Sequence, residues 1–265
     1  MVSDLATTLW RRIGSCLAWA VYIFLLLPTL IVIPIAFGDS AEVQFPPATW
    51  SLGLFRRFFA DEIWMTSLWT SIEVALVSSL IALLVGVPAA YGLARAWIRG
   101  RSAVQLILMS PLLVPSIVLA LGVYLYLGRA GLSGTKTGII LAHTAYVLPF
   151  VVVTASSGLK ALDARIELAV QVLGANRSQV LRYVVIPQLR PTILVSFLFA
   201  FLMSFDEVVL SWFLSGTSAT TLPVKMFTAI HWEVSPVLAA VATLLTIVSA
   251  AACLGAALLQ RNPTH

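Results

Sequence analysis

Six apolar segments, each long enough to cross a membrane as a helix, constrain the fold of this chain more than any other feature. A helix needs about 20 apolar residues to cross the ~30 Å hydrocarbon core of a bilayer. The chain is 60% hydrophobic and 10% charged, whereas soluble domains carry about 25% charged residues. We therefore predict a single all-α membrane domain with six transmembrane helices. The predicted spans are residues 13–37, 63–94, 104–127, 138–159, 192–213 and 237–259.

Lysine and arginine are unevenly divided between the two sides of the predicted membrane. Eleven lie in the chain ends and in connections 95–103 and 160–191, and five lie in connections 38–62, 128–137 and 214–236 (11 + 5 = 16). Cytoplasmic connections are enriched in these residues, so both termini and the segment 160–191 are expected in the cytoplasm. Membrane lipid is thus an expected partner. The basic residues form no run, and we expect no nucleic-acid partner.

The cytoplasmic segment 160–191 has the pattern of a helix, a turn and a second helix. Gly174 follows the first apolar face and is expected to adopt the left-handed conformation that ends a helix. Asn176 and Gln179 resemble a capping box that starts the second helix, which Pro187 is expected to end before the fifth span. The apolar face of the first helix consists of Ile166, Ala169, Val170 and Leu173.

Two interpretations of this helix-turn-helix remain open on physical grounds. Its apolar faces can lie on lipid headgroups, with Arg177, Arg182 and Arg190 facing phosphates. Alternatively, the first helix inserts its apolar face into a groove on a soluble partner. Glu167 and Gln171, which lie among the apolar residues, fit a protein groove better than lipid.

Ionisable residues inside predicted spans are the best pointers to a substrate pathway. Glu73 lies within the second span, and Asp206 and Glu207 lie well inside the fifth. Adjacent helix positions differ by about 100°, so Asp206 and Glu207 cannot share one face. Trp212, further along the same span, would offer a cation–π surface to an amine. The alternative is that these carboxylates are structural and stabilise contacts between membrane subunits.

Residues 168–187 resemble the cytoplasmic signature of permease subunits of ABC-type importers, written EAA, three residues, G, nine residues, I, any residue, LP. Aligned on Gly174, Leu168 replaces the consensus glutamate and Glu167 precedes it. The resemblance extends over most of the chain and is nearest to the spermidine/putrescine (polyamine) permeases. The resembling stretches are AAYGLAR (89–95), AHTAYVLPFVVV (142–153), FLMSFDEVVLSWFLSG (201–216), TLPVKM (221–226) and VSP (234–236).

This resemblance implies the type I ABC importer permease fold and a transport subunit that is not itself an enzyme. It also implies a bacterial inner-membrane location and three kinds of protein partner: two cytoplasmic ATPase subunits, a second and different permease chain, and a periplasmic substrate-binding protein. No cofactor is expected on this chain, because ATP and Mg would bind to the ATPase. The implied ATPase-coupling residues are Ile166, Glu167, Ala169, Val170, Leu173, Gly174 and Ala175.

The same resemblance predicts ATP-driven import of putrescine, spermidine or a related amine-bearing solute. Ser116 stands where polyamine permeases commonly carry an acidic residue, so aminoethylphosphonate, ferric iron or an amino acid are alternative cargoes. A distant alternative is an intramembrane serine protease, with Ser133 as nucleophile and His143 or His231 as base. The candidate pathway residues for the importer are Asp206, Glu207, Glu73 and Trp212.

Overall fold

The protein is almost entirely helical in the part of the chain that the structure describes. The computed structural model describes residues 2–40, 42–95, 100–216 and 219–260. Arg99 and Arg261, which count toward the predicted cytoplasmic side, lie outside the described residues. The chain divides into two compact units, Met1–Met65 with Thr228–His265, and Thr66–Phe227. The predicted all-α class is confirmed.

The first unit is built around two long apolar helices, α1 (Val2–Ala36) and α12 (Val237–Gln260). α12 contacts both α1 and the short amphipathic helix α2 (Gly53–Ala60). A π-helix, η2 (Ala229–Glu233), precedes α12. Most apolar side chains of α1 are exposed, which suits a helix whose surroundings are lipid.

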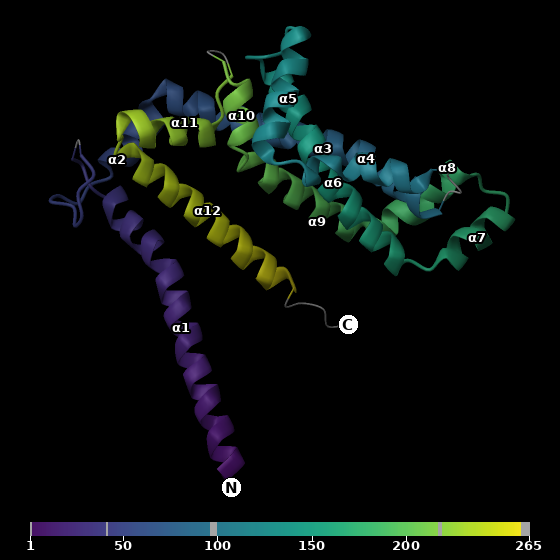
Figure 1. Ribbon diagram of the computed structural model, residues 1–265, viewed down its shortest axis with the longest axis horizontal. Helices are drawn as coiled ribbons and strands as arrows, with labels where there is room; N and C mark the ends of the chain where they lie inside the picture. The colour runs from purple at the N-terminus through teal and green to yellow at the C-terminus, as the bar shows by residue number, and fades with distance from the viewer. Residues whose placement is uncertain (1, 41, 96–99, 217–218, 261–265) are drawn as a thin grey trace. The chain divides into compact units, whose positions relative to one another are not determined.

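The second unit has a core formed by buried apolar side chains of its three longest helices, α3, α6 and α9. α6 and α9 lie side by side (Figure 1). Gly158 allows this close approach, because a Cβ at Gly158 would lie 2.6 Å from Oγ1 of Thr192. The helices of this unit are α3 (Glu62–Arg95), α4 (Arg101–Leu113), α5 (Ser116–Arg129), α6 (Lys136–Ala161), α7 (Ala164–Val172), α8 (Arg177–Val180), the π-helix η1 (Leu181–Val185), α9 (Ile186–Phe205), α10 (Val209–Leu214) and α11 (Leu222–Thr228).

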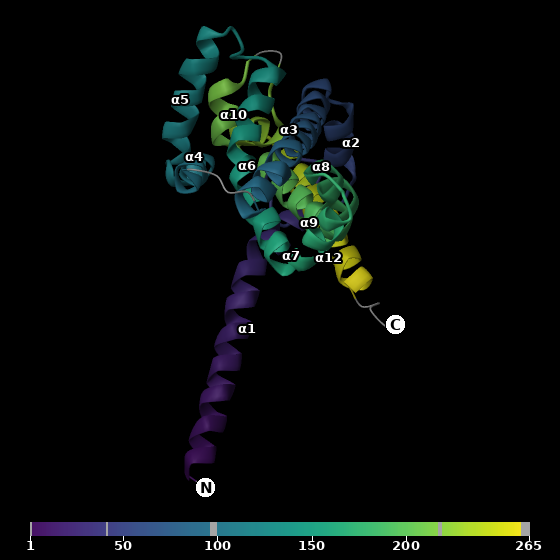
Figure 2. The same ribbon diagram turned by 90° about the vertical axis from the view of Figure 1, so that its right-hand side faces the viewer.

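The third predicted span, 104–127, is two helices rather than one. The axes of α4 and α5 differ by 106°, and the bend is visible in Figure 2. Pro115 causes the break, because proline disfavours the helical conformation in the residue before it. Val114 accordingly has an extended backbone, with φ −94° and ψ 131°. The prediction of one continuous helix here is therefore wrong.

The fifth predicted span, 192–213, is also interrupted. α9 ends at Phe205 and α10 begins at Val209, so the polar pair Asp206 and Glu207 lies in the break. A helix can be broken inside a membrane only where other groups bind the freed backbone N–H and C=O groups. The break therefore requires side chains that take over this role, and Glu207 is one of them, since it accepts hydrogen bonds from two backbone N–H groups of α10.

At its cytoplasmic end, the same helix is longer than the sequence suggests. It runs without a break from Arg177 to Phe205, and η1 forms part of it. Pro187 therefore does not end the second cytoplasmic helix, contrary to the prediction. The π turn directly before Pro187 is one of the local adjustments that accommodate proline within a helix.

Four described helices are individually long and apolar enough to cross a membrane. The bent pair α4 and α5 adds a fifth if it crosses as one span, and the described apolar stretch Val237–Ala251 of α12 is shorter. The structure thus describes four to five candidate spans, and the count of six stays a prediction. The four helices are Trp10–Ala36, Glu62–Arg95, Lys136–Ala161 and Arg177–Phe205.

Candidate functional site

The predicted cytoplasmic helix-turn-helix is present as α7 followed by α8. Gly174, directly after α7, has φ +96°, so its left-handed conformation is confirmed. The Gly174 N–H donates to the Gln171 carbonyl at 2.9 Å, and the Ala175 N–H donates to the Val170 carbonyl at 3.2 Å. These two bonds form a Schellman motif, which satisfies the last carbonyls of the helix.

The start of α8 is fixed by the capping box that the sequence predicts. The Gln179 N–H donates to Oδ1 of Asn176 at 2.9 Å, and the Asn176 N–H donates to Oε1 of Gln179 at 2.8 Å. Because hydrogen bonds define both the end of α7 and the start of α8, the turn between them has a specified geometry. α7 therefore projects in a defined direction from the end of α9 (Figure 1).

One side of α7 presents large apolar side chains to its surroundings. Val172 and Leu173 are each 87% exposed. Val170 and Ala175, predicted as coupling residues, pack instead against the core of the second unit. Leu168 and Val172 were missed, although their i, i+4 spacing would have placed them on one face. We call the exposed set the α7 surface, consisting of Ile166, Leu168, Ala169, Val172 and Leu173.

Glu167, also predicted to contact an ATPase, lies inside the protein instead. It is only 5% exposed. Arg95 Nε donates to Oε1 of Glu167 at 2.9 Å, and the Tyr91 hydroxyl donates to Oε2 at 3.0 Å. Arg95 also donates to the carbonyl oxygens of Leu159 at 3.1 Å and Leu162 at 3.2 Å. A single ion pair, with its carboxylate buried and its guanidinium partly exposed, therefore ties α7 to the ends of both α3 and α6.

The two adjacent carboxylates of the fifth span have different environments. Glu207 is 8% exposed, and its Oε1 accepts hydrogen bonds from the N–H groups of Val209 at 2.8 Å and Leu210 at 3.0 Å. It thus caps the first turn of α10. Asp206 is exposed, and among the described residues its side chain makes no hydrogen bond or ion pair.

His143 of α6 binds both sides of the same break. Its Nδ1 lies 2.8 Å from Oγ of Ser204 on α9, and its Nε2 lies 2.9 Å from Oγ of Ser211 on α10. Ser204 is in turn 2.9 Å from Oγ of Ser78 on α3. Because both ring nitrogens are engaged, His143 holds the broken span together and cannot serve Ser133, whose hydroxyl donates to the Tyr124 carbonyl at 3.4 Å.

The other two candidate pathway residues are engaged elsewhere. The carboxylate of Glu73 is half-exposed and pairs with the Nζ of Lys136 at 2.6 Å. Trp212 packs edge-on against Phe227, with ring centroids 5.0 Å apart. Across the described residues, no group of three His, Cys, Asp or Glu side chains is arranged to hold a metal ion.

Comparison with known families gives one match over most of the second unit and α12. Residues 82–262 match the family described as "Binding-protein-dependent transport system inner membrane component". The matched region contains α7, the ion pair that holds it and the interrupted fifth span.

Curated relatives align over nearly the whole chain. The chain is 29% identical over 248 residues to the spermidine/putrescine transport system permease protein PotC of Haemophilus influenzae, covering 93% of this chain and 96% of that protein. It is 31% identical over 244 residues to the putrescine transport system permease protein PotI of Escherichia coli, covering 89% of this chain and 85% of that protein.

Two solved structures share the fold. A bacterial ABC transporter involved in import of the acidic polysaccharide alginate superposes with a TM-score of 0.73 at 18% identity, covering 98% of each chain. The MetNI methionine ABC transporter, in an inward-facing conformation, superposes with a TM-score of 0.59 at 19% identity, covering 77% of this chain and 100% of that one. At such low identity the likeness concerns the fold alone.

Replacing Arg95 with alanine is expected to destabilise the protein, because it leaves the Glu167 carboxylate, 5% exposed, without its cation. Breaking a fully buried ion pair costs about 3–5 kcal/mol, and this pair should cost less because the Arg95 side chain is 24% exposed. Replacing Glu167 should cost less still, because water can hydrate the remaining Arg95, and the double variant should cost less than the sum of the single variants. Thermal unfolding of the purified wild-type, single and double variants would measure this coupling.

The exposed pair between Arg57 and Asp39, 3.1 Å apart, provides a matched control. Its coupling energy should lie between about 0 and 1 kcal/mol, because water screens both charges. Strictly additive losses at Glu167 and Arg95 would contradict a coupled pair.

Proposed function

The chain belongs to the family of binding-protein-dependent transport system inner membrane components, and we propose that it imports putrescine, spermidine or a related amine-bearing solute. It is the permease subunit of an ABC importer and has the type I importer permease fold that the sequence predicts. Members of this family transport rather than catalyse, and a separate ATPase hydrolyses ATP. The observation that carries the polyamine assignment is the 29–31% identity to polyamine permeases over about nine-tenths of the chain.

We propose that the α7 surface seats in a cleft of the cytoplasmic ATPase. Exposed Val172 and Leu173 support this, since apolar side chains in a well-packed groove provide most of the binding energy of a docked helix. The defined turn at Gly174 supports it as well, because a coupling element must transmit motion without bending. Glu167 contributes indirectly, by fixing α7 to α3.

The proposed assembly contains this chain, a different second permease chain, two ATPase subunits that bind ATP and Mg, and a periplasmic substrate-binding protein. In this arrangement the chain crosses the bacterial inner membrane six times, with both termini and α7 in the cytoplasm. The excess of lysine and arginine in the connections on that side supports this orientation.

We propose Asp206 as the pathway carboxylate and assign Glu207 a structural role. Asp206 is exposed at a helix break, whereas the carboxylate of Glu207 already binds two backbone N–H groups. An unpaired carboxylate attracts an ammonium group, which suits a polyamine.

Uptake of labelled putrescine and spermidine is expected to fall to background in cells that lack this gene, and to return when the gene is restored. Aminoethylphosphonate serves as the comparator, because it carries one amine and a phosphonate. If the cells without the gene lose aminoethylphosphonate uptake but take up polyamines unchanged, the polyamine assignment is refuted. The chain would then still be an importer permease, with a different cargo.

Leu173→Ala and Gly174→Asp are each expected to weaken ATPase binding about tenfold or more. The first removes an exposed apolar contact, and the second places a side chain at φ +96°. Co-purification of the ATPase and transport-coupled ATP hydrolysis would measure the effect. Leu84→Ala is the matched control, since this leucine of α3 is 76% exposed but lies outside α7. Full ATPase binding and transport in both α7 variants would refute the assignment.

Asp206→Asn is expected to raise the KM for polyamine uptake about tenfold while the complex still assembles, because one charge-assisted contact is lost. Glu207→Gln should instead lower the thermal unfolding midpoint, because an amide oxygen is a weaker cap for α10. Concentration-dependent uptake and thermal unfolding of both variants separate these roles. The reverse pattern would exchange the two assignments.

A further inference from the structure

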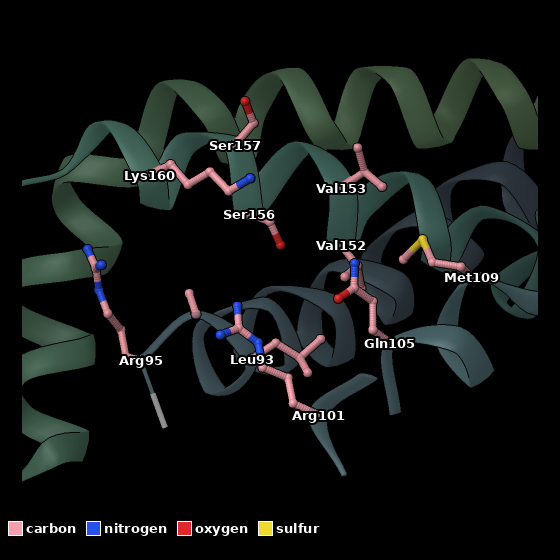
Figure 3. Close-up of a pocket in the computed structure, with 11 residues that line it drawn as sticks. Leu93, Arg95, Arg101, Gln105, Met109, Val152, Val153, Ser156, Ser157 and Lys160 are labelled. Carbon is pink, nitrogen blue, oxygen red and sulfur yellow. The ribbon is translucent and has the colours of Figure 1, made fainter. Parts of the chain in front are cut away.

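A cavity of about 500 Å³ lies between the ends of α3, α4 and α6, away from both the α7 surface and the interrupted fifth span. Figure 3 shows that the Lys160 amine and the Ser156 hydroxyl extend from α6 toward the space into which Arg101 and Gln105 extend from α4. Four hydrogen-bond donors from two helices thus converge on one cavity.

Among the described residues, no carboxylate that lines this cavity balances its positive charge. Its lining includes Arg95, Arg101 and Lys160 but no aspartate or glutamate. Arg95 is already paired with Glu167. Within the described part of the chain, no ion pair is recorded for Arg101 or Lys160. Two cations that face one polar cavity without a carboxylate favour an anion there.

The cavity is also amphipathic along its length. Met109, Val152 and Val153 form its apolar part (Figure 3). Beyond it, α4 exposes large apolar side chains, among them Leu106 and Ile107. An occupant that fits has a compact anionic group at one end and a hydrocarbon portion at the other.

We propose that this cavity binds the phosphate of an anionic phospholipid from the cytoplasmic leaflet. Guanidinium, ammonium, hydroxyl and amide donors are the groups that bind phosphate oxygens, and basic pockets between transmembrane helices on the cytoplasmic side suit anionic headgroups. The placement in that leaflet rests on the orientation given under the proposed function. The phosphate would lie beside Arg95, the residue that holds α7 in place.

The test is a lipid titration of the purified transporter complex, read by native mass spectrometry. Phosphatidylglycerol is the probe, phosphatidylcholine the zwitterionic comparator, and glycerol 3-phosphate the soluble phosphate. Wild-type complex is expected to prefer phosphatidylglycerol. R101Q/K160Q should weaken that binding roughly thirty-fold at low salt, because each cation contributes about fivefold. R101K/K160R should restore it.

R11Q/R12Q is the matched control, because it removes two exposed cations of α1 that do not line the cavity. This variant should bind phosphatidylglycerol as the wild type does. Equal losses in both glutamine variants, or no preference over phosphatidylcholine, would overturn the proposal. If glycerol 3-phosphate binds as tightly as phosphatidylglycerol, and its binding depends equally on Arg101 and Lys160, the cavity is a site for free phosphate compounds. That result would overturn the proposal that a lipid occupies it. Uptake assays play no part in this readout, so its outcome is independent of the transported solute.

Discussion

The ion pair of Arg95 and Glu167 is the interaction on which the arrangement of the second unit's cytoplasmic end depends. One guanidinium binds a carboxylate of α7 and two carbonyl oxygens at the end of α6, while itself belonging to the last turn of α3. A charged group removed from water must be paired, so Glu167 is stable in its buried position only while Arg95 and the Tyr91 hydroxyl bind it. A helix of nine residues, too short to be stable by itself, is thereby held in place against α3 and α6.

Polar groups inside the second unit are used mainly to stabilise an irregular backbone. The fifth span breaks at Asp206, and the freed N–H groups at the start of α10 bind the carboxylate of Glu207. His143 then connects α9 to α10 through two serine hydroxyls. In a bilayer such groups find no water, so each must find a protein partner. An intramembrane carboxylate is therefore not by itself evidence of a substrate pathway. A carboxylate that stabilises no backbone group, such as Asp206, is the better candidate for one.

The sequence predicts local features of this protein well and distant contacts poorly. Gly174 and the capping box of Asn176 and Gln179 depend on neighbouring residues, so their geometry follows from the order of amino acids. The break at Pro115 was also encoded locally, but the strong apolar pattern of 104–127 concealed it. The burial of Glu167 could not be predicted, because Arg95 lies 72 positions away and only the packing of α3 against α7 brings them together.

The fold alone cannot determine what such a permease transports. Structures of an alginate transporter and a methionine transporter share it with this chain at 18–19% identity. The same fold therefore occurs in transporters of unrelated cargoes, so selectivity must come from particular side chains rather than from the fold. Among the candidate pathway residues, Glu73 is paired with the cation of Lys136, and the carboxylate of Glu207 is occupied by two backbone N–H donors. Asp206 is exposed and bears no such contact, which is why we propose it, rather than Glu73 or Glu207, as the group through which this subunit favours a cationic solute.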